Sequence, residues 1–354
     1  MIATEYKDFS LKMYDKSYLG EVPTHGHFEL TFKCPLKCVF CYCTCYTNPE
    51  YTKNEVTTLE AKKILDQAAE AGCLWMTFSG GDPFIRSDFK EIYEHAYSLG
   101  FIISIFCSGL IVTDEWLDLL QKKPPFKMEL PLYGITEEVY ERVSGKKNTF
   151  QKAISNIKKL QKAGLNIKIK SKILSLNLHE SLALKSFVEI ELGLTFNPNH
   201  FLYPRLDKTS EHLQYRLSPH QIKMLEMVYG EMNCDSSTEN QQADEVNPKL
   251  FRCAAGVNSF YINPYGELNF CTYVRESSFN LKKGDLKEGI RILKNNLLTK
   301  TYDNASDCKS CSIQGSCQNC PGHAVLETGK LDGKSEYLCE VNHVRRGLSV
   351  GAVV

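Results

Sequence analysis

Six apolar stretches alternate with amphipathic stretches over residues 27–202. We expect strands at 27–32, 74–79, 101–107, 127–132, 166–173 and 194–202, each bounded by turn-forming residues such as Gly and Pro. The stretches between them predict helices at 61–70, 89–99, 113–120, 150–163 and 180–192. Such an alternation predicts an α/β fold, in which a parallel sheet with helices outside curls into a full or partial TIM-like barrel, here a partial (β/α)6 barrel.

The rest of the chain is arranged around this barrel. At 354 residues the chain is long enough for one large α/β domain and a smaller one. We expect an N-terminal lead-in at 1–26, the barrel at 27–202, a bridging region at 203–250, a small cysteine-rich domain at 251–345 and a C-terminal tail at 346–354. The bridging region has a helix pattern at 219–229 and a polar stretch at 235–245.

Cysteine content and charge balance restrict the classes of function. Fifteen cysteines are many for a chain that has no secretory signal and no apolar stretch near the roughly 20 residues of a membrane span. We therefore expect a cytoplasmic protein without a membrane partner, in which cysteines indicate metal or redox chemistry rather than disulfides. The 42 basic and 42 acidic residues form no basic run, so nothing indicates nucleic acid as a partner.

A cysteine triplet follows the first expected strand directly. Cys34, Cys38 and Cys41 lie in the loop at the carboxyl end of that strand. Three thiolates held this closely can bind three corners of an iron–sulfur cluster and leave the fourth iron free. Cys43 and Cys45 come next, so counting alone leaves a four-ligand site open, but we expect both to stay outside the cluster.

A second motif follows the second expected strand. The turn Gly80-Gly81-Asp82-Pro83 suits neither a helix nor a strand. It lies, like the triplet, at the carboxyl end of a strand, where barrels of this kind carry their chemistry. Three further side chains lie at or near strand ends: Glu129, Tyr133 and Tyr203. On the simpler interpretation they pack the barrel or lie at its rim, and on the alternative interpretation they line a pocket. Cys73 and Cys107 are expected to be small buried apolar residues.

Seven more cysteines lie after residue 250. They are Cys253, Cys271, Cys308, Cys311, Cys317, Cys320 and Cys339. A β-hairpin is expected at 261–271, and C-x-x-C pairs with few apolar neighbours predict that metal organises this segment. The spacing allows a zinc ribbon as well as iron–sulfur clusters. Seven thiols exceed one tetrahedral zinc site, which favours two centres.

Together these motifs resemble the radical S-adenosylmethionine (SAM) family with a C-terminal SPASM extension. Cys34-x3-Cys38-x2-Cys41 resembles the cysteine signature of the family, and the turn at 80–83 resembles its Gly-Gly-Glu-Pro motif. The run from Gly266 to the last cysteine resembles the SPASM extension, which carries auxiliary [4Fe–4S] clusters. The resemblance covers roughly residues 25–345.

The resemblance implies three [4Fe–4S] clusters. The first is held by Cys34, Cys38 and Cys41, and its open iron takes the amino and carboxylate groups of SAM. One auxiliary cluster is held by Cys308, Cys311, Cys317 and Cys339, and the other by Cys253, Cys271 and Cys320. The spacing before Cys320 is one residue tighter than is common in the family, which leaves its role open. The fourth position of this last cluster is either taken by Cys234 or open to substrate, and we expect it to be open.

For SAM itself the resemblance implies contacts from several loops. Phe40 would pack beside the adenine, and Ser171 and Asn177 would reach the ribose. The backbone oxygens of Gly80, Gly81 and Asp82 would face the methionine amino group, together with the Asp82 side chain, one methylene shorter than the usual Glu. Lys170 would bind the SAM carboxylate, with a solvated strand lysine as the equal alternative.

The function that the resemblance implies is oxidative radical chemistry. The reduced first cluster would cleave SAM to methionine and a 5′-deoxyadenosyl radical, which abstracts a hydrogen atom from substrate. Enzymes similar to this modify peptides, so we expect a maturase that forms a thioether or carbon–carbon crosslink in a ribosomal peptide. Only about 25 residues precede the first strand, so leader recognition is expected to need a separate protein or the enzyme itself. An electron donor such as flavodoxin or ferredoxin is also expected.

Three alternatives stay open. One is an anaerobic sulfatase-maturating enzyme that forms formylglycine, for which the sequence offers no clear general base. Another is a peptide epimerase, for which Cys107 is a weak candidate hydrogen donor. The third, from a different class, is a non-catalytic zinc or electron-carrier protein.

Overall fold

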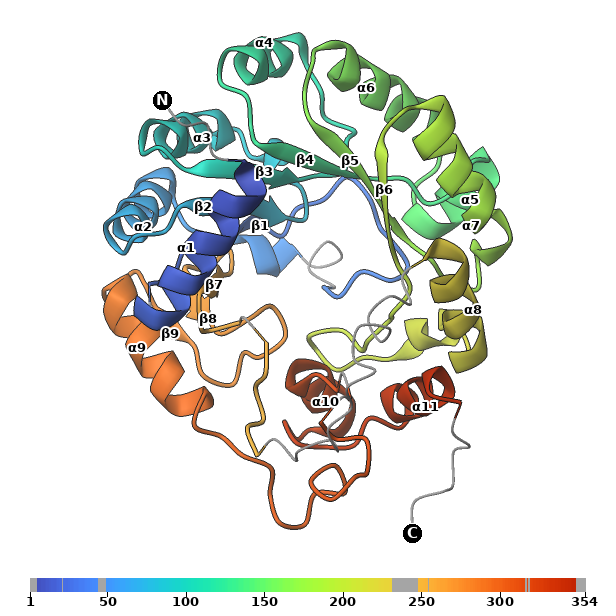
Figure 1. Cartoon of the computed structure of the whole chain (residues 1–354). Coiled ribbons are helices and arrows are strands. Elements are labelled where there is room, and N and C mark those ends of the chain that lie inside the picture. Colours follow the sequence, from blue (N-terminus) through green and yellow to red (C-terminus); the bar gives the residue numbers. More distant parts are fainter. Residues whose placement is uncertain are drawn as a thin grey trace.

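The computed structural model describes residues 5–20, 22–43, 49–230, 248–253, 255–315, 317 and 319–347. In this part of the chain the strands form one nine-stranded sheet in the order β6-β5-β4-β3-β2-β1-β7-β8-β9. The strands are β1 (His25–Thr31), β2 (Trp75–Gly80), β3 (Ile102–Phe106), β4 (Lys127–Pro131), β5 (Ile167–Lys172), β6 (Thr195–Asn199), β7 (Ser259–Ile262), β8 (Glu267–Asn269) and β9 (Phe279–Asn280). Strands β1 to β6 pair in parallel with their neighbours, and the sheet curves as a partial barrel (Figure 1), which confirms the predicted fold class.

The α-helices are α1 (Tyr6–Gly20), α2 (Thr58–Glu70), α3 (Phe89–Ser98), α4 (Asp114–Lys122), α5 (Glu137–Ser144), α6 (Phe150–Lys162), α7 (Ser181–Ser186), α8 (Pro219–Tyr229), α9 (Leu286–Leu297), α10 (Pro321–Thr328) and α11 (Glu336–Arg345). Helices α2 to α7 lie around the outside of the curved sheet, whereas α10 and α11 lie apart from it, at the bottom of the view in Figure 1. The short helices are η2 (Pro49–Thr52), η3 (Pro83–Ile85), η4 (Leu178–Glu180), η5 (Phe187–Glu191, a π-helix) and η6 (Glu211–Tyr215). Helix α2 begins with a capping box, in which the Thr57 side chain accepts from Glu60 N while Glu60 accepts from Thr57 N.

Sequence reasoning missed some elements of the barrel. Helix α1 lies in the region expected to be a lead-in, and α5 lies between β4 and α6, where no helix was expected. The signal for α5 was the pair Val139 and Val143, which lie four residues apart and are both buried. The single helix expected at 180–192 is in fact η4, α7 and η5 in succession.

The cysteine-rich segment joins the barrel through its sheet. The hairpin expected at 261–271 is present, because β7 pairs antiparallel with β8. In addition β7 pairs in parallel with β1, with His25 opposite Ser259 and Phe28 opposite Ile262. The hairpin therefore extends the barrel sheet beyond β1. No local sequence pattern predicts this long-range pairing.

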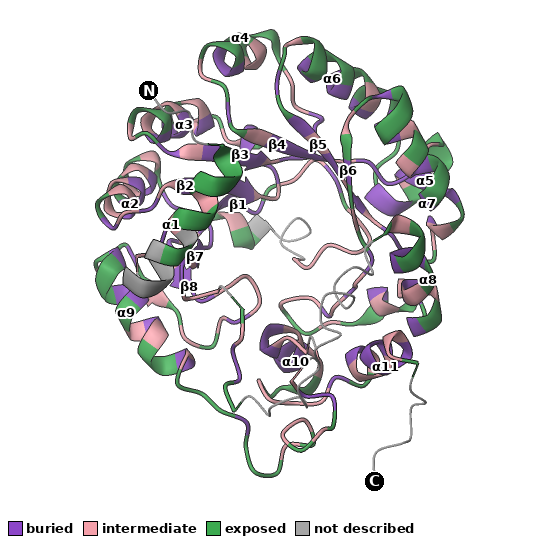
Figure 2. Cartoon of the chain, in the orientation of Figure 1, coloured by how far each residue is buried: buried purple, intermediate pink, exposed green. Residues whose placement is uncertain are grey.

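The inner face of the barrel is polar. On β1, Phe28 and Leu30 are fully buried, and the residues that alternate with them are His27 and Glu29. Lysines alternate in the same way with buried isoleucines on β5. Buried residues line the sheet in Figure 2, while the outer faces of the helices are exposed. A charged inner face is unusual for packing alone and points to a site inside the barrel.

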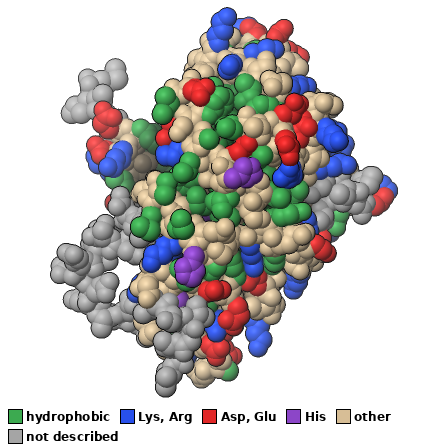
Figure 3. All heavy atoms as spheres, turned by 90° about the vertical axis from the view of Figure 1, so that its right-hand side faces the viewer, with side chains coloured by type: hydrophobic (Ala, Val, Ile, Leu, Met, Phe, Trp, Pro, Cys, Tyr) green, Lys and Arg blue, Asp and Glu red, His purple; other side chains and the backbone are tan. Residues whose placement is uncertain are grey.

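The outer surface carries mixed charge. On the face shown in Figure 3, basic and acidic side chains are interspersed with apolar ones. No helix in the described ranges is both long enough and apolar enough to cross a membrane.

Candidate active site

The glycine turn after β2 docks on the cysteine loop. Gly81 N donates to Thr31 O at 2.7 Å, and Asp82 N donates to Lys33 O at 2.8 Å. A Cβ atom on Gly80 would lie 2.2 Å from Thr31 O, and one on Gly81 would lie 2.1 Å from Lys33 O. Both positions therefore require glycine, because any side chain would push the turn off the loop.

The Asp82 carboxylate is used within the chain. It is fully buried, caps η3 by accepting from Phe84 N at 2.9 Å, and accepts from Ser108 N at 3.0 Å and from the Ser108 hydroxyl. Burial raises the pKa of Asp82, and the bonds from Ser108 and Phe84 oppose that rise. The expected role of this side chain at the methionine amino group has no support in this geometry, which leaves the backbone of the turn to face the cavity.

The three cysteines after β1 open onto one cavity. Cys34, Cys38 and Cys41 all line it, and the Cys38 thiol lies 3.6 Å from the Tyr133 hydroxyl. Burial raises the pKa of all three thiols, to about 12 for Cys38, and neighbouring thiols raise each pKa further. Buried thiolates crowded in this way need a cationic partner, so the donor set fits an iron–sulfur cluster.

The cavity has a volume of about 620 Å³, within the usual range for a ligand site. Five of the residues expected to contact SAM line it: Phe40, Gly80, Gly81, Lys170 and Ser171. Asn177 does not line the cavity in the described structure. Its side-chain amide donates to Tyr133 O and Lys172 O and accepts from Leu174 N. The sequence left open whether three side chains pack the barrel or line a pocket. All three line the cavity: Glu129, Tyr133 and Tyr203.

Lys170 is not a free cation. Its Nζ lies 2.6 Å from Glu129 Oε2, while Lys127 Nζ lies 2.6 Å from Glu129 Oε1. The Lys170 ammonium also lies 4.3 Å from the centre of the Phe106 ring. The Lys170 side chain is 44% exposed, so it is a partly solvated lysine held in an ion pair, and any anion that binds Lys170 shares it with Glu129.

Two polar groups on β1, one half-buried and one buried, were missed by sequence reasoning. The His27 ring is hydrogen-bonded to the Ser79 hydroxyl, and its pKa is lowered to about 4 by burial and by Lys170. Glu29 is fully buried, accepts from the Tyr42 hydroxyl and lies 3.7 Å from Arg275. The alternation of polar residues along the first strand was the signal that could have found both.

Four further residues that sequence reasoning missed line the cavity together with Tyr203, across the barrel from the glycine turn: Lys172, Asn199, Tyr273 and His323. Lys172 on β5 donates to Asn199 Oδ1 on β6 at 2.5 Å. The His323 ring on α10 stacks on Tyr203 with centroids 3.3 Å apart, and Tyr273 meets the same ring edge-on at 4.8 Å. All five side chains line the cavity.

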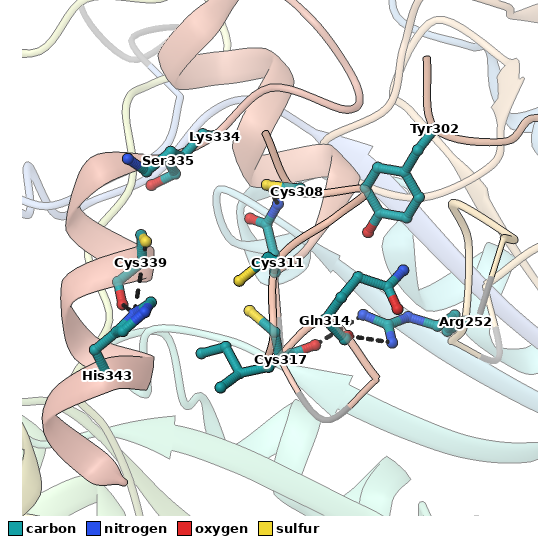
Figure 4. Close-up of a pocket in the computed structure, with 12 residues that line it drawn as sticks. Arg252, Tyr302, Cys308, Cys311, Gln314, Cys317, Lys334, Ser335, Cys339 and His343 are labelled. Carbon is teal, nitrogen blue, oxygen red and sulfur yellow. Dashed lines mark hydrogen bonds between the residues drawn. The ribbon is translucent and has the colours of Figure 1, made fainter. Parts of the chain in front are cut away.

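Four of the later cysteines form one group (Figure 4). Cys308, Cys311, Cys317 and Cys339 line a small pocket between α11 and the loop before α10. Burial and the other three thiols raise the pKa of Cys308 to about 11. The side chain of Arg252 donates to the carbonyls of Gln314, Gly315 and Cys317 at 2.8–3.0 Å and so fixes the loop. This grouping is the one expected for one auxiliary cluster.

The remaining three form a second group. Burial, with Cys320 and Cys253 as neighbouring thiols, raises the pKa of Cys271 to about 11. Burial and the same neighbour Cys253 raise the pKa of Cys320. Cys320 therefore lies with this group despite its tighter spacing. Cys234, the possible fourth ligand, lies outside the described residues.

The other cysteines occupy different environments. Cys73 is buried in the core as expected, whereas Cys107 belongs to the core and also lines the cavity. Cys43 lines the cavity beside Cys41, whose pKa it helps to raise. Cys45 lies outside the described residues.

Comparison with known proteins assigns part of the chain to a family. Residues 28–180 match the Radical SAM superfamily, so this part of the chain is a radical SAM domain. A PqqA peptide cyclase of Bradyrhizobium diazoefficiens is 30% identical over 176 residues, which are 49% of this chain and 44% of that protein. The chain thus spans a little less than half the length of this curated relative. An AdoMet-dependent heme synthase of Methanosarcina barkeri is 22% identical over 331 residues, 85% of this chain and 92% of that protein.

A solved structure resembles nearly the whole chain. Streptococcus suis SuiB bound to S-adenosylmethionine superimposes with a TM-score of 0.69 at 15% identity and covers 96% of this chain and 84% of its own. SuiB bound to its precursor peptide SuiA gives the same TM-score at 17% identity, with 96% and 83% covered. At these identities the likeness establishes the fold.

Proposed function

We propose that this chain, with a radical SAM domain at residues 28–180, is an oxidoreductase that abstracts hydrogen from a peptide and forms a thioether or carbon–carbon crosslink in it. One observation carries the proposal. A single cavity of about 620 Å³ is bounded by the cysteine triplet and the glycine turn on one side and by Tyr273 and His323, neighbours of two auxiliary-group cysteines, on the other. The relatives named for peptides, the PqqA peptide cyclase and SuiB with its precursor peptide, support the substrate class.

The first cluster would be held by Cys34, Cys38 and Cys41. When bound, it supplies the electron that cleaves SAM to methionine and the hydrogen-abstracting 5′-deoxyadenosyl radical. The docked turn of Gly80 and Gly81 presents backbone oxygens to the amino group of SAM. Phe40, Lys170 and Ser171 provide an aromatic face, a cation and a hydroxyl at the same cavity.

The two later cysteine groups would hold the auxiliary clusters. Cys308, Cys311, Cys317 and Cys339 offer four thiolates to one cluster. Cys253, Cys271 and Cys320 offer three to the other, which leaves one iron for Cys234 or for substrate. We propose three [4Fe–4S] clusters in total; the auxiliary pair, when held by these cysteines, would accept the one electron that the substrate radical loses, with a proton, as the crosslink forms.

The protein itself positions the reactants and excludes water. The aromatic side chains of Phe40, Tyr133 and Tyr203 line the cavity and leave little room for solvent beside a bound ligand. The Glu129 carboxylate, held by two lysines, fixes the Lys170 ammonium in place. A bound reactant held between these side chains keeps the radical on the intended hydrogen atom.

The proposal also names partners and a compartment. Clusters held by thiolates require a reducing environment, so we propose a cytoplasmic enzyme. A flavodoxin or ferredoxin would supply electrons. A separate leader-recognition protein would present the precursor peptide, unless the enzyme recognises it directly.

An anaerobic turnover experiment tests this function. The iron–sulfur-loaded protein is reduced, mixed with SAM and with small cysteine-bearing peptides encoded beside its gene, and 5′-deoxyadenosine and peptide mass are measured. We expect a brown protein that forms 5′-deoxyadenosine and a peptide that loses two hydrogens, whereas Cys38→Ala forms neither. A colourless, zinc-loaded protein without SAM cleavage would refute the proposal.

Peptide epimerisation is the second candidate, because the Cys107 thiol lines the cavity. Burial holds the pKa of this thiol well above its ordinary value, so it keeps the hydrogen that a donor needs. Turnover in D₂O separates the two: an epimerised peptide gains one deuterium at Cα without net loss of hydrogen, and a crosslinked peptide does not.

A further inference from the structure

The inner face of β5 presents two lysines to the cavity, and they differ in their partners. Lys170 is paired with Glu129 at 2.6 Å. Lys172, two residues further toward the carboxyl end, donates to the amide oxygen of Asn199 at 2.5 Å. No carboxylate of the described residues lies within 4.0 Å of the Lys172 ammonium. An ammonium at a cavity wall with only a neutral acceptor has room for an anion from outside the chain.

The surroundings of Lys172 are otherwise uncharged or positive. Lys170 lies on the same strand, and burial together with Lys170 lowers the pKa of Lys172 to about 7. From α10, the His323 ring faces it and stacks on Tyr203. The surroundings of Lys172 therefore lack a negative charge, and a bound ligand could supply it.

Lys172 lies beyond the β5 residues that are expected to contact SAM, Lys170 and Ser171, toward the carboxyl end of the strand. The glycine turn follows β2, whereas Lys172 ends β5, three places further along the sheet, and Asn199 ends the edge strand β6. The third wall comes from α10, where His323 follows the auxiliary-group cysteine Cys320 by three residues. A ligand group at Lys172 thus lies on the auxiliary-cluster side, where the peptide rather than the nucleoside is expected.

We propose that Lys172, aided by Asn199, binds a carboxylate of the peptide substrate, either an Asp or Glu side chain or the C-terminal carboxylate. This rests on the proposed function, since it names the substrate chemistry of the same cavity. The stacked rings of Tyr203 and His323 and the edge of Tyr273 form the adjoining wall, against which the apolar part of the acidic residue packs.

The test uses the loaded enzyme with SAM bound and follows anaerobic reductive methylation of lysines by peptide mapping. Three probes compete: Ac-Ala-Glu-Ala-NH₂ for a side-chain carboxylate, Ac-Ala-Ala-Ala-OH for a terminal one and Ac-Ala-Gln-Ala-NH₂ for neither. We expect one of the two carboxylate probes to protect Lys172 at a concentration at least about tenfold below that of the glutamine probe. The probe that protects identifies the source of the carboxylate. Equal protection by all three, or none, overturns the proposal.

Two variants sharpen the result. Asn199→Asp places a carboxylate of the chain beside the ammonium, so we expect the preference for acidic probes to disappear. Lys168→Met is the matched control, because Lys168 lies on the same face of β5 but does not line the cavity in the described structure, and it should leave the preference unchanged. Equal preference in wild type and Asn199→Asp would also overturn the assignment.

A parallel readout keeps this inference apart from the proposed function. SAM affinity and 5′-deoxyadenosine formation are measured for wild type and Lys172→Met. We expect the variant to bind SAM as wild type does; a tenfold loss of SAM affinity would move Lys172 to the SAM site and overturn the proposal. If wild type cleaves no SAM, the proposed function fails, while the methylation result still decides whether Lys172 binds a carboxylate.

Discussion

The docking of the glycine turn on the cysteine loop can be tested by one added methyl group. In Gly81→Ala the new Cβ would lie 2.1 Å from Lys33 O and 2.7 Å from Phe32 O, both rigid backbone atoms. The turn must therefore move away and lose the bonds from Gly81 N to Thr31 O and from Asp82 N to Lys33 O. At about 1 kcal/mol for each bond, the docked arrangement loses about 2 kcal/mol, or about 30-fold in population.

The assay combines denaturant unfolding with equilibrium binding of SAM to the loaded protein. We expect Gly81→Ala to unfold at lower denaturant and to bind SAM at least about tenfold more weakly, because the backbone oxygens leave their place. Gly100→Ala is the matched control: Gly100 has φ of +82° and a Cβ added there would meet nothing within 4 Å, so strain lowers stability while SAM affinity stays unchanged. Wild-type SAM affinity in Gly81→Ala would refute the argument.

The remaining predictions concern the cysteines and the helix that carries one of them. Cys308→Ala should lower the iron content by about four atoms per chain, whereas Cys73→Ala, which alters a core thiol, should leave iron unchanged; equal iron loss in both would remove the basis for the grouping. Glu226→Gln should destabilise the protein by about 1–3 kcal/mol in urea unfolding at pH 7, because His200 (2.9 Å) and Arg345 lose their buried carboxylate partner. Burial raises the pKa of Glu226, but hydrogen bonds from His200 and Arg345 outweigh it and leave the pKa below 4.5. The wild-type advantage should therefore be present above pH 4.5 and shrink as the pH falls through the lowered pKa, and a constant difference down to acid pH would contradict this assignment.

Local sequence signals were sufficient where the determining interactions are local. The β/α alternation predicted the parallel barrel, because strands and helices can be recognised by the spacing of their apolar residues. The capping box that begins α2 is equally local, because Thr57 and Glu60 are three residues apart. The cysteine triplet and the glycine turn were paired correctly because both follow strands, and parallel strands end at one edge of a sheet.

Long-range geometry was not readable in this way. The hydrogen bonds of the Asp82 carboxylate depend on Ser108, 26 residues away, and the ion pair of Lys170 depends on Glu129, which lies on the next strand. The two-group sorting of the later cysteines was expected from a family resemblance, and the pairing of β7 with β1 was not expected at all.

The sequence by itself determined the barrel class and the cysteine loop, because each depends on residues close together in the chain. The need for glycine in the turn after β2 comes instead from tertiary contacts with Thr31 and Lys33. The tertiary structure decided which polar side chains share the cavity. His27, Lys172 and His323 come from β1, β5 and α10, and only the curvature of the sheet and the return of the C-terminal segment bring them to one cavity. Their burial and their charged neighbours, rather than their residue type, set the pKa of each group and so its chemistry.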